Sequence, residues 1–150
     1  MSGPASWTVL NQSHSPAFIR MLGRLSRTQG PCRLLTGMAI EEAVEGVSPA
    51  RGPGYSRTSL GRRLLSWLAF MLWVSPRTLF GPKPAQILAL TNPPMLPQLA
   101  WLASRLRGIP YALIIWDLYP DHVVTQGWMS ASNPVVRLWR VLNRWAFDGA

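Results

Sequence analysis

The chain has 150 residues, of which 48% are hydrophobic and 14% are charged. It is long enough for one domain with a buried core, too apolar for a disordered protein, and too interrupted for a polytopic membrane protein. Its 15 basic residues, all arginine except Lys83, outnumber 6 acids and give a net charge of +9, which favours partners that carry phosphate. The single cysteine, Cys32, allows no internal disulfide and gives no sign of an oxidising compartment.

The first third of the chain predicts a strand, a helix and a second strand. Apolar residues 7–11 predict the first strand. Ser15, followed by a proline, is a favourable cap for a helix that ends at Gly30. Residues 33–36 predict the second strand. The stretch 38–59 contains half of the acids and several prolines and glycines, so it predicts a loop with room for one short strand.

A long apolar segment follows this loop. A helix is predicted over residues 60–74, capped by Thr58 or Ser59. Residues 64–74 are apolar all round, but this segment is about half the ~20 residues that cross a bilayer. We therefore expect a buried helix or one that lies at a membrane interface. Three prolines between residues 76 and 84 predict a rigid connector.

The clearest unit of the sequence is a strand, a helix and a second strand. The strands are predicted at residues 87–90 and, fully buried, at 111–116. The helix between them follows two prolines and ends at Gly108. Its predicted buried stripe consists of Leu96, Leu99, Leu102, Ala103 and Leu106. A strand, helix and strand of this kind form a βαβ unit, which implies a parallel sheet.

The last predicted helix begins at Asn133 and Pro134. One of its faces is apolar and consists of Val135, Leu138, Leu142 and Trp145. The complete order of elements predicts an α/β fold, a Rossmann-like doubly wound parallel sheet.

Polar residues stand where the two strands of the βαβ unit end, which is the edge where open parallel sheets bind ligands. Thr91 or Asn92 is expected to cap the next helix, and these side chains can also bind an anion or a sugar hydroxyl. Asp117 is either a turn residue or a group that holds a hydroxyl and accepts its proton. Asp121 is more typical of a helix start than of a catalyst.

Other familiar sites are missing from the sequence. His14 and His122 are isolated, and no residues have metal-ligand spacing, so no metal is expected. The chain contains no GxGxxG loop, no P-loop and no nucleophile elbow. No cofactor is therefore expected.

Arginine stripes and the 8 tryptophans form a further feature. The interpretation we favour is a membrane surface, with arginines on lipid phosphates and tryptophans at headgroup level. The alternative is solvated helix faces beside core tryptophans. Nucleic acid is less favoured, because the arginines are spread over several helices and no reading motif is present. The residues expected at the membrane are Arg20, Arg24, Arg27, Trp67, Trp73, Arg137, Arg140 and Arg144.

From residue 87 onward the sequence resembles the N-terminal domain of family 4 glycosyltransferases with the GT-B fold. Members linked to exopolysaccharide and lipid-linked sugar synthesis share a Thr-x-Pro-Pro turn and an Asp-Leu-(Trp/Tyr)-Pro-(Glu/Asp) motif with a glycine soon after. Here these positions are Thr91, Pro93, Pro94, Asp117, Leu118, Tyr119, Pro120, Asp121 and Gly127. Residues 34–37 are similar to the family's second strand. The family's Gly-rich turn after the first strand is replaced by residues 13–16, and the histidine that often precedes the aspartate is replaced by Trp116.

The resemblance implies a two-domain enzyme whose N-terminal half binds an acceptor, often a lipid-linked sugar that carries diphosphate. The C-terminal half binds the nucleotide sugar, commonly through a Glu-x7-Glu pair that this chain lacks. Residues 1–150 are therefore expected to be a separately encoded or truncated acceptor half of a retaining glycosyltransferase, inactive alone. Asp117 is the expected catalytic residue, and the expected acceptor-binding residues are His14, Thr91, Asn92 and Asp121.

Two alternatives stay open. The chain is a non-catalytic binding or scaffold module completed by a partner chain, or, less favoured, a basic nucleic-acid-binding protein. The first residues are small and polar and show no secretory signal. We therefore expect a cytoplasmic protein that is peripheral on the inner face of the cell membrane if the arginine stripes bind lipid.

Overall fold

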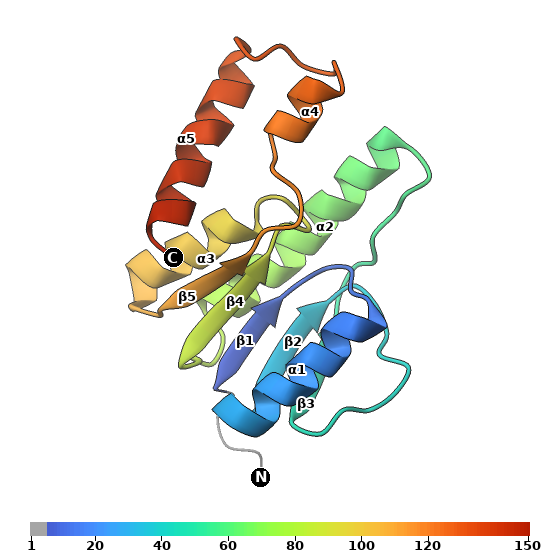
Figure 1. Cartoon of the computed structure of the whole chain (residues 1–150), viewed down its shortest axis with the longest axis vertical. Coiled ribbons are helices and arrows are strands. Elements are labelled where there is room, and N and C mark those ends of the chain that lie inside the picture. Colours follow the sequence, from blue (N-terminus) through green and yellow to red (C-terminus); the bar gives the residue numbers. More distant parts are fainter. Residues whose placement is uncertain (1–5) are drawn as a thin grey trace.

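A computed structural model describes residues 6–150, and residues 1–5, part of the segment considered for a secretory signal, lie outside the described residues. Five strands form one parallel sheet in the order β3-β2-β1-β4-β5, which confirms the predicted Rossmann-like α/β fold (Figure 1). In chain order the elements are β1 (Trp7–Leu10), α1 (Pro16–Gln29), β2 (Cys32–Thr36), β3 (Val47–Arg51), α2 (Leu60–Leu79), β4 (Gln86–Leu90), α3 (Leu96–Arg107), β5 (Tyr111–Ile114), α4 (Asp121–Thr125) and α5 (Pro134–Asp148).

The order of strands reverses between β1 and β4. From β1 the chain adds β2 and β3 on one side and then crosses to add β4 and β5 on the other. In doubly wound sheets, ligands bind outside the carboxyl ends of the strands at this switch point, because the loops there diverge and leave a crevice. The residues that follow β1 and β4 are therefore the first place to seek a site.

Helices cover both faces of the sheet, as a doubly wound fold requires. On one face α1 packs through Phe18 and Leu22 onto Val9 and Leu34. On the other face α2 and α3 pack onto the sheet, and Phe70 is fully buried at the centre of that cluster. In Figure 1, α1 lies in front of β2 and β3, while α2 and α3 lie behind the strands. Among residues 6–150, no helix is both long and apolar enough to cross a membrane.

Several predicted helix ends are confirmed. Ser15 and Ser59 are the N-caps of α1 and α2, and each hydroxyl accepts a backbone N–H of the first turn. Asn133 caps α5 in the same way. Gly108 ends α3 in the left-handed conformation that only glycine adopts without strain.

The predicted end of α2 and the connector at Pro76 were wrong. The helix continues to Leu79 with Pro76 inside it. An interior proline costs about 3 kcal/mol of helix propensity. Val74 and Thr78, on either side of it, are both buried, and Arg107 donates hydrogen bonds to the carbonyl oxygens of Thr78 and Gly81. Tertiary packing therefore carries the helix through the proline.

The two edge strands compare differently with the prediction. β3 is the one short strand for which the stretch 38–59 was expected to have room. It contains Pro49, which an edge strand tolerates because one side of its backbone needs no partner. β5 ends at Ile114 and is mostly half-buried instead of fully buried to residue 116. Trp116 is 72% exposed. β5 lies at the edge of the sheet, so its apolar side chains are less buried than those of a central strand.

The start of α3 also differs. Its N-cap is Met95, without a side-chain hydrogen bond, so the expected cap at Thr91 or Asn92 was wrong. Residues 91–95 form a turn across the sheet edge instead. Leu102 and Leu106, expected in the buried stripe, are exposed, because α3 packs on the sheet through residues such as Ala100 and Ala103.

The helix α5 returns alongside α3. The rings of Trp101 and Trp145 stack with their centroids 5.7 Å apart, and the Tyr111 hydroxyl donates to the carbonyl oxygen of Ala146 at 2.6 Å. The buried face of α5 is formed by residues such as Val136 and Ala146. Its predicted apolar face points mostly outward: Val135, Leu138 and Trp145 are exposed, and Leu142 is half-buried.

Gly37 tests how tightly the loops after β1, β2 and β3 are packed. A Cβ at this position would overlap the carbonyl oxygen of Pro53 and lie 3.0 Å from that of Gln12. We predict that Gly37→Ala lowers the free energy of unfolding by about 1–3 kcal/mol, measured by urea denaturation.

The control is Gly61→Ala in the first turn of α2, where a Cβ meets nothing within 4 Å. That change should be neutral or stabilise by up to about 1 kcal/mol. Equal effects of the two substitutions would contradict the packing described for residue 37.

Candidate functional site

Two adjoining cavities open at the carboxyl edge of the sheet. The α2-side cavity has a volume of about 240 Å³ and includes Arg63, Trp67 and Tyr119. The α1-side cavity has a volume of about 280 Å³ and includes Asn11 and His14. Three residues line both cavities, and they are Arg57, Asn92 and Asp117. The two cavities therefore form one continuous site at the topological switch point.

Gln12 holds the loops around this site together. Its side chain is fully buried, and Nε2 donates to the carbonyl oxygens of Pro53, Gly54 and Ser66 at 2.9–3.3 Å. Its backbone N–H donates to the carbonyl oxygen of Asn92 at 2.9 Å, and its own carbonyl accepts from the N–H of Gly37 at 2.9 Å. Gln12, in the loop after β1, is thus a single residue that contacts the loops after β2, β3 and β4 and the first half of α2.

Thr91 positions the turn that carries Asp117. The Thr91 hydroxyl oxygen accepts hydrogen bonds from the backbone N–H groups of Trp116 at 3.1 Å and Asp117 at 3.3 Å. Thr91 itself is buried, whereas the Asp117 side chain is exposed at the mouth of both cavities. The end of β4 therefore fixes the backbone from which the carboxylate projects.

Aromatic rings form a wall at the α2-side cavity. Trp67 stacks with Tyr55 at 6.4 Å between ring centroids and meets Tyr119 edge-on at 5.8 Å. Tyr119 in turn stacks with Trp139 of α5 at 5.9 Å. Burial raises the pKa of the Tyr119 hydroxyl, and the nearby Asp117 carboxylate and Tyr55 raise it further, while Arg63 lowers it. The phenol keeps its proton at neutral pH and can donate a hydrogen bond.

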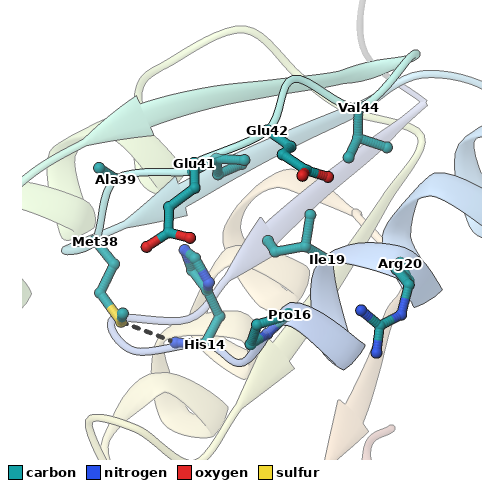
Figure 2. Close-up of a pocket in the computed structure, with 10 residues that line it drawn as sticks. His14, Pro16, Ile19, Arg20, Met38, Ala39, Glu41, Glu42 and Val44 are labelled. Atoms are coloured by element: carbon teal, nitrogen blue, oxygen red, sulfur yellow. Dashed lines mark hydrogen bonds between the residues drawn. The ribbon is translucent and has the colours of Figure 1, made fainter.

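His14 lies between the α1-side cavity and a third cavity. This third cavity has a volume of about 310 Å³ and lies between the start of α1 and the loop before β3. Figure 2 shows the His14 ring and the Glu41 carboxylate turned toward one another across it. Burial lowers the pKa of His14, so its imidazole is neutral at neutral pH and can accept a hydrogen bond or a proton.

Asp121 does not belong to the two cavities. It begins α4, as its position after Pro120 predicted, and pairs with Arg140 of α5 at 2.5 Å between Oδ1 and Nη2. Both side chains are about half exposed, and such pairs contribute only about 0–1 kcal/mol. The structure therefore separates Asp121 from the other predicted acceptor-binding residues, His14, Thr91 and Asn92. Arg140, which was expected at the membrane surface, forms an ion pair with Asp121.

The tryptophans expected at a membrane surface are turned inward. Trp67 lines the α2-side cavity, and Trp73 packs against Phe70 beneath the guanidinium of Arg77. The large apolar residues of α2 that are exposed are instead Leu60, Leu64, Leu65, Leu68 and Leu72. Arg20, Arg24 and Arg27 are exposed along α1, and Arg137 and Arg144 are exposed along α5.

The site also contains residues that the sequence alone did not single out. Asn11 and Gln12 follow β1, Tyr55 and Arg57 lie in the stretch that gave no clear pattern, and Arg63 lies one turn before Trp67. Asn11 and Gln12 had a usable signal, because the residues after the first strand of a doubly wound sheet always lie at the switch point. Among residues 6–150, no three His, Cys, Asp or Glu side chains are grouped as metal ligands.

Compared with known proteins, the chain matches no family model, no curated protein and no solved structure. The resemblance to family 4 glycosyltransferases therefore stays a prediction from the motif residues of the sequence alone. Two of those motifs, around Thr91 and Asp117, meet at the site described above.

Gln12 provides a test of the site's architecture. Replacing it with leucine leaves three backbone carbonyls without their donor, so Gln12→Leu should cost about 1–3 kcal/mol of unfolding free energy. Urea denaturation followed by tryptophan fluorescence measures this loss. The matched change Gln86→Leu, at an exposed glutamine that begins β4, should stay within about 0.5 kcal/mol. A loss no larger than that of the Gln86 variant would argue against the linking role of Gln12.

Proposed function

We propose that the chain binds a sugar acceptor at the carboxyl edge of its sheet and is the acceptor-binding half of a retaining glycosyltransferase. The observation that carries the proposal is the pair Asn92 and Asp117, which lines both cavities at the switch point. The motif that resembles the glycosyltransferase family supplies Asp117, and Asn92 stands at the variable position of the Thr-x-Pro-Pro turn.

The chemistry of the site fits a polyhydroxyl ligand. The Asp117 carboxylate accepts hydrogen bonds from ring hydroxyls, and the Asn92 amide both accepts and donates them. Aromatic faces such as those of Trp67 and Tyr119 pack against the apolar face of a sugar. Asp117 is exposed beside both cavities, where it can hold an acceptor hydroxyl and take its proton. For retention, that oxygen would bond to the anomeric carbon on the same face from which the nucleoside diphosphate of the donor departs. His14, neutral at the far side, is a second hydrogen-bond acceptor.

Transfer also requires a nucleotide sugar held opposite the acceptor. In enzymes with the GT-B fold a second α/β domain supplies that half, whereas residues 6–150 form one sheet. The proposal therefore includes a partner that carries the nucleotide-sugar domain. A binding or scaffold module completed by such a partner would use the same acceptor site without chemistry of its own.

We also propose that the domain works at an anionic membrane surface. The outward face of α5 exposes Leu138 and Trp145 beside Arg137 and Arg144. Apolar side chains next to arginines suit the boundary between acyl chains and lipid phosphates. The sequence predicted that Trp67 and Trp73 lie at the membrane. In this proposal the exposed leucines of α2 contact the membrane instead of these tryptophans. A lipid-linked acceptor would then reach the site from the surface on which the domain rests.

The acceptor proposal predicts that Asp117→Asn weakens acceptor binding. The probes are citronellyl diphosphate monosaccharides of glucose, galactose, mannose and N-acetylglucosamine, titrated by isothermal calorimetry against the full chain. Loss of the charged hydrogen-bond acceptor should weaken the tightest probe about tenfold or more.

The control is Asp121→Asn, which removes a carboxylate of the same neighbourhood that lies outside both cavities. Its affinity should match that of the unmodified chain. Equal weakening by the two substitutions, or no binding of any probe, would count against an acceptor site at Asp117.

The membrane proposal predicts co-sedimentation with vesicles that contain phosphatidylglycerol and not with phosphatidylcholine alone. Arg144→Gln should weaken this binding about fivefold, because one arginine near an anionic surface is worth about 1 kcal/mol. Arg51→Gln, at an exposed arginine on β3, is the control. Release of the protein from the vesicles by added RNA would favour the nucleic-acid alternative instead.

A further inference from the structure

We propose that the α2-side cavity is a phosphate subsite, which orients the acceptor with its phosphate toward α2 and its sugar toward α1. This inference rests on the proposed acceptor site and adds to it the direction of the ligand and the residues that set it. Each cavity is smaller than the roughly 300–1,000 Å³ typical of small-molecule pockets. A sugar phosphate would therefore occupy both.

Two side chains that line the α2-side cavity each carry a buried donor that has no acceptor among the described residues. The Arg63 Nε–H and the Trp67 Nε1–H are both inaccessible to solvent, and neither has a hydrogen-bond partner among the described residues. They lie four residues apart on α2, so they occupy the same helix face, and both side chains line the cavity. Buried N–H groups are nearly always paired, which points to a ligand rich in acceptor oxygens.

The charges in this cavity favour an anion. The guanidinium groups of Arg57 and Arg63 both line it, and among residues 6–150 the ion pair that forms is the one between Asp121 and Arg140. Neither Arg57 nor Arg63 is thus neutralised by a carboxylate of the described chain. Guanidinium groups match the geometry of phosphate oxygens, and an indole N–H adds a neutral donor.

The α1-side cavity shares Arg57 and Asp117 with the α2-side cavity, but its own residues add acceptors instead of donors. Asn11 is 2% exposed, lines this cavity, and its Oδ1 has no partner among the described residues. His14 is neutral at neutral pH, and its buried Nε2 is also without a partner among those residues. An amide oxygen and an imidazole nitrogen of this kind can accept hydrogen bonds from the hydroxyls of a sugar ring.

The reverse orientation is unfavourable for an electrostatic reason. It would place the phosphate oxygens, which are acceptors, next to Asn11 Oδ1, which is also an acceptor, so no hydrogen bond could form between them. It would also leave the Arg63 and Trp67 donors unpaired. Asp117 lies where the cavities join and repels phosphate toward the arginines on the α2 side. The same carboxylate can then accept hydrogen bonds from the sugar hydroxyls in the α1-side cavity.

Inorganic pyrophosphate is the first probe, because its binding does not depend on the identity of the sugar. By calorimetry, Arg63→Gln should weaken pyrophosphate binding at least tenfold, and Trp67→Phe, which keeps a ring but removes the N–H, several-fold. Arg62→Gln is the matched control, because Arg62 is the exposed neighbour on α2 and lines neither cavity. Asn11→Ala should leave pyrophosphate binding within twofold and weaken the citronellyl diphosphate sugar.

The outcomes separate the two proposals. If a citronellyl probe binds and Arg63→Gln changes its affinity no more than Arg62→Gln does, the phosphate subsite is overturned and the acceptor site stands. If pyrophosphate binds through Arg63 and no sugar probe binds, the orientation is overturned along with the acceptor proposal. Should Arg63→Gln fail to fold, Arg57→Gln repeats the test at an exposed side chain. Absence of pyrophosphate binding to the unmodified chain overturns the inference.

Discussion

The carboxyl edge of the sheet depends on the hydrogen bonds of one fully buried residue, Gln12. Its amide reaches the loop after β3 and the first half of α2, and its backbone joins the loops after β2 and β4. An unpaired carbonyl inside this edge would be costly, so these bonds fix where each loop lies. Arg57, Asn92 and the α2 residues of the site are held by segments that Gln12 links directly.

The site that results divides its charges in space. Asp117 projects from a turn whose N–H groups bond to Thr91, while Arg57 and Arg63 approach from the α2 side without forming an ion pair with it. Because these charged groups do not pair with one another, the arginine donors and the carboxylate acceptor are each free to bind a ligand. A ligand with an anionic end and a hydroxylated end satisfies both, and a sugar phosphate is such a ligand.

The helices α2 and α5 serve the site with one face and expose apolar residues on the other. Trp67 and Trp139 reach inward to the rings beside Tyr119, whereas Leu68 of α2 and Leu138 of α5 face outward. If the outward faces rest on a membrane, the acceptor site and the surface that delivers a lipid-linked acceptor belong to the same two helices. The periodicity of the sequence showed that α5 has an apolar face. The face that is buried in the structure is a different one, with Val136 and Ala146, because α5 packs against α3 through that side.

The sequence by itself determined the parallel α/β fold, the helix caps at Ser15 and Asn133, a cap for α2 at Thr58 or Ser59, and the edge at which Asn92 and Asp117 meet. These features follow from local chemistry, because caps, turns and apolar runs act on neighbouring residues. Tertiary structure decided the rest: that α2 passes through Pro76, that Thr91 bonds to the turn after β5 instead of capping α3, and that Asp121 pairs with Arg140. Each of these depends on a partner 19 or more residues away or on packing against the core, which no local pattern encodes.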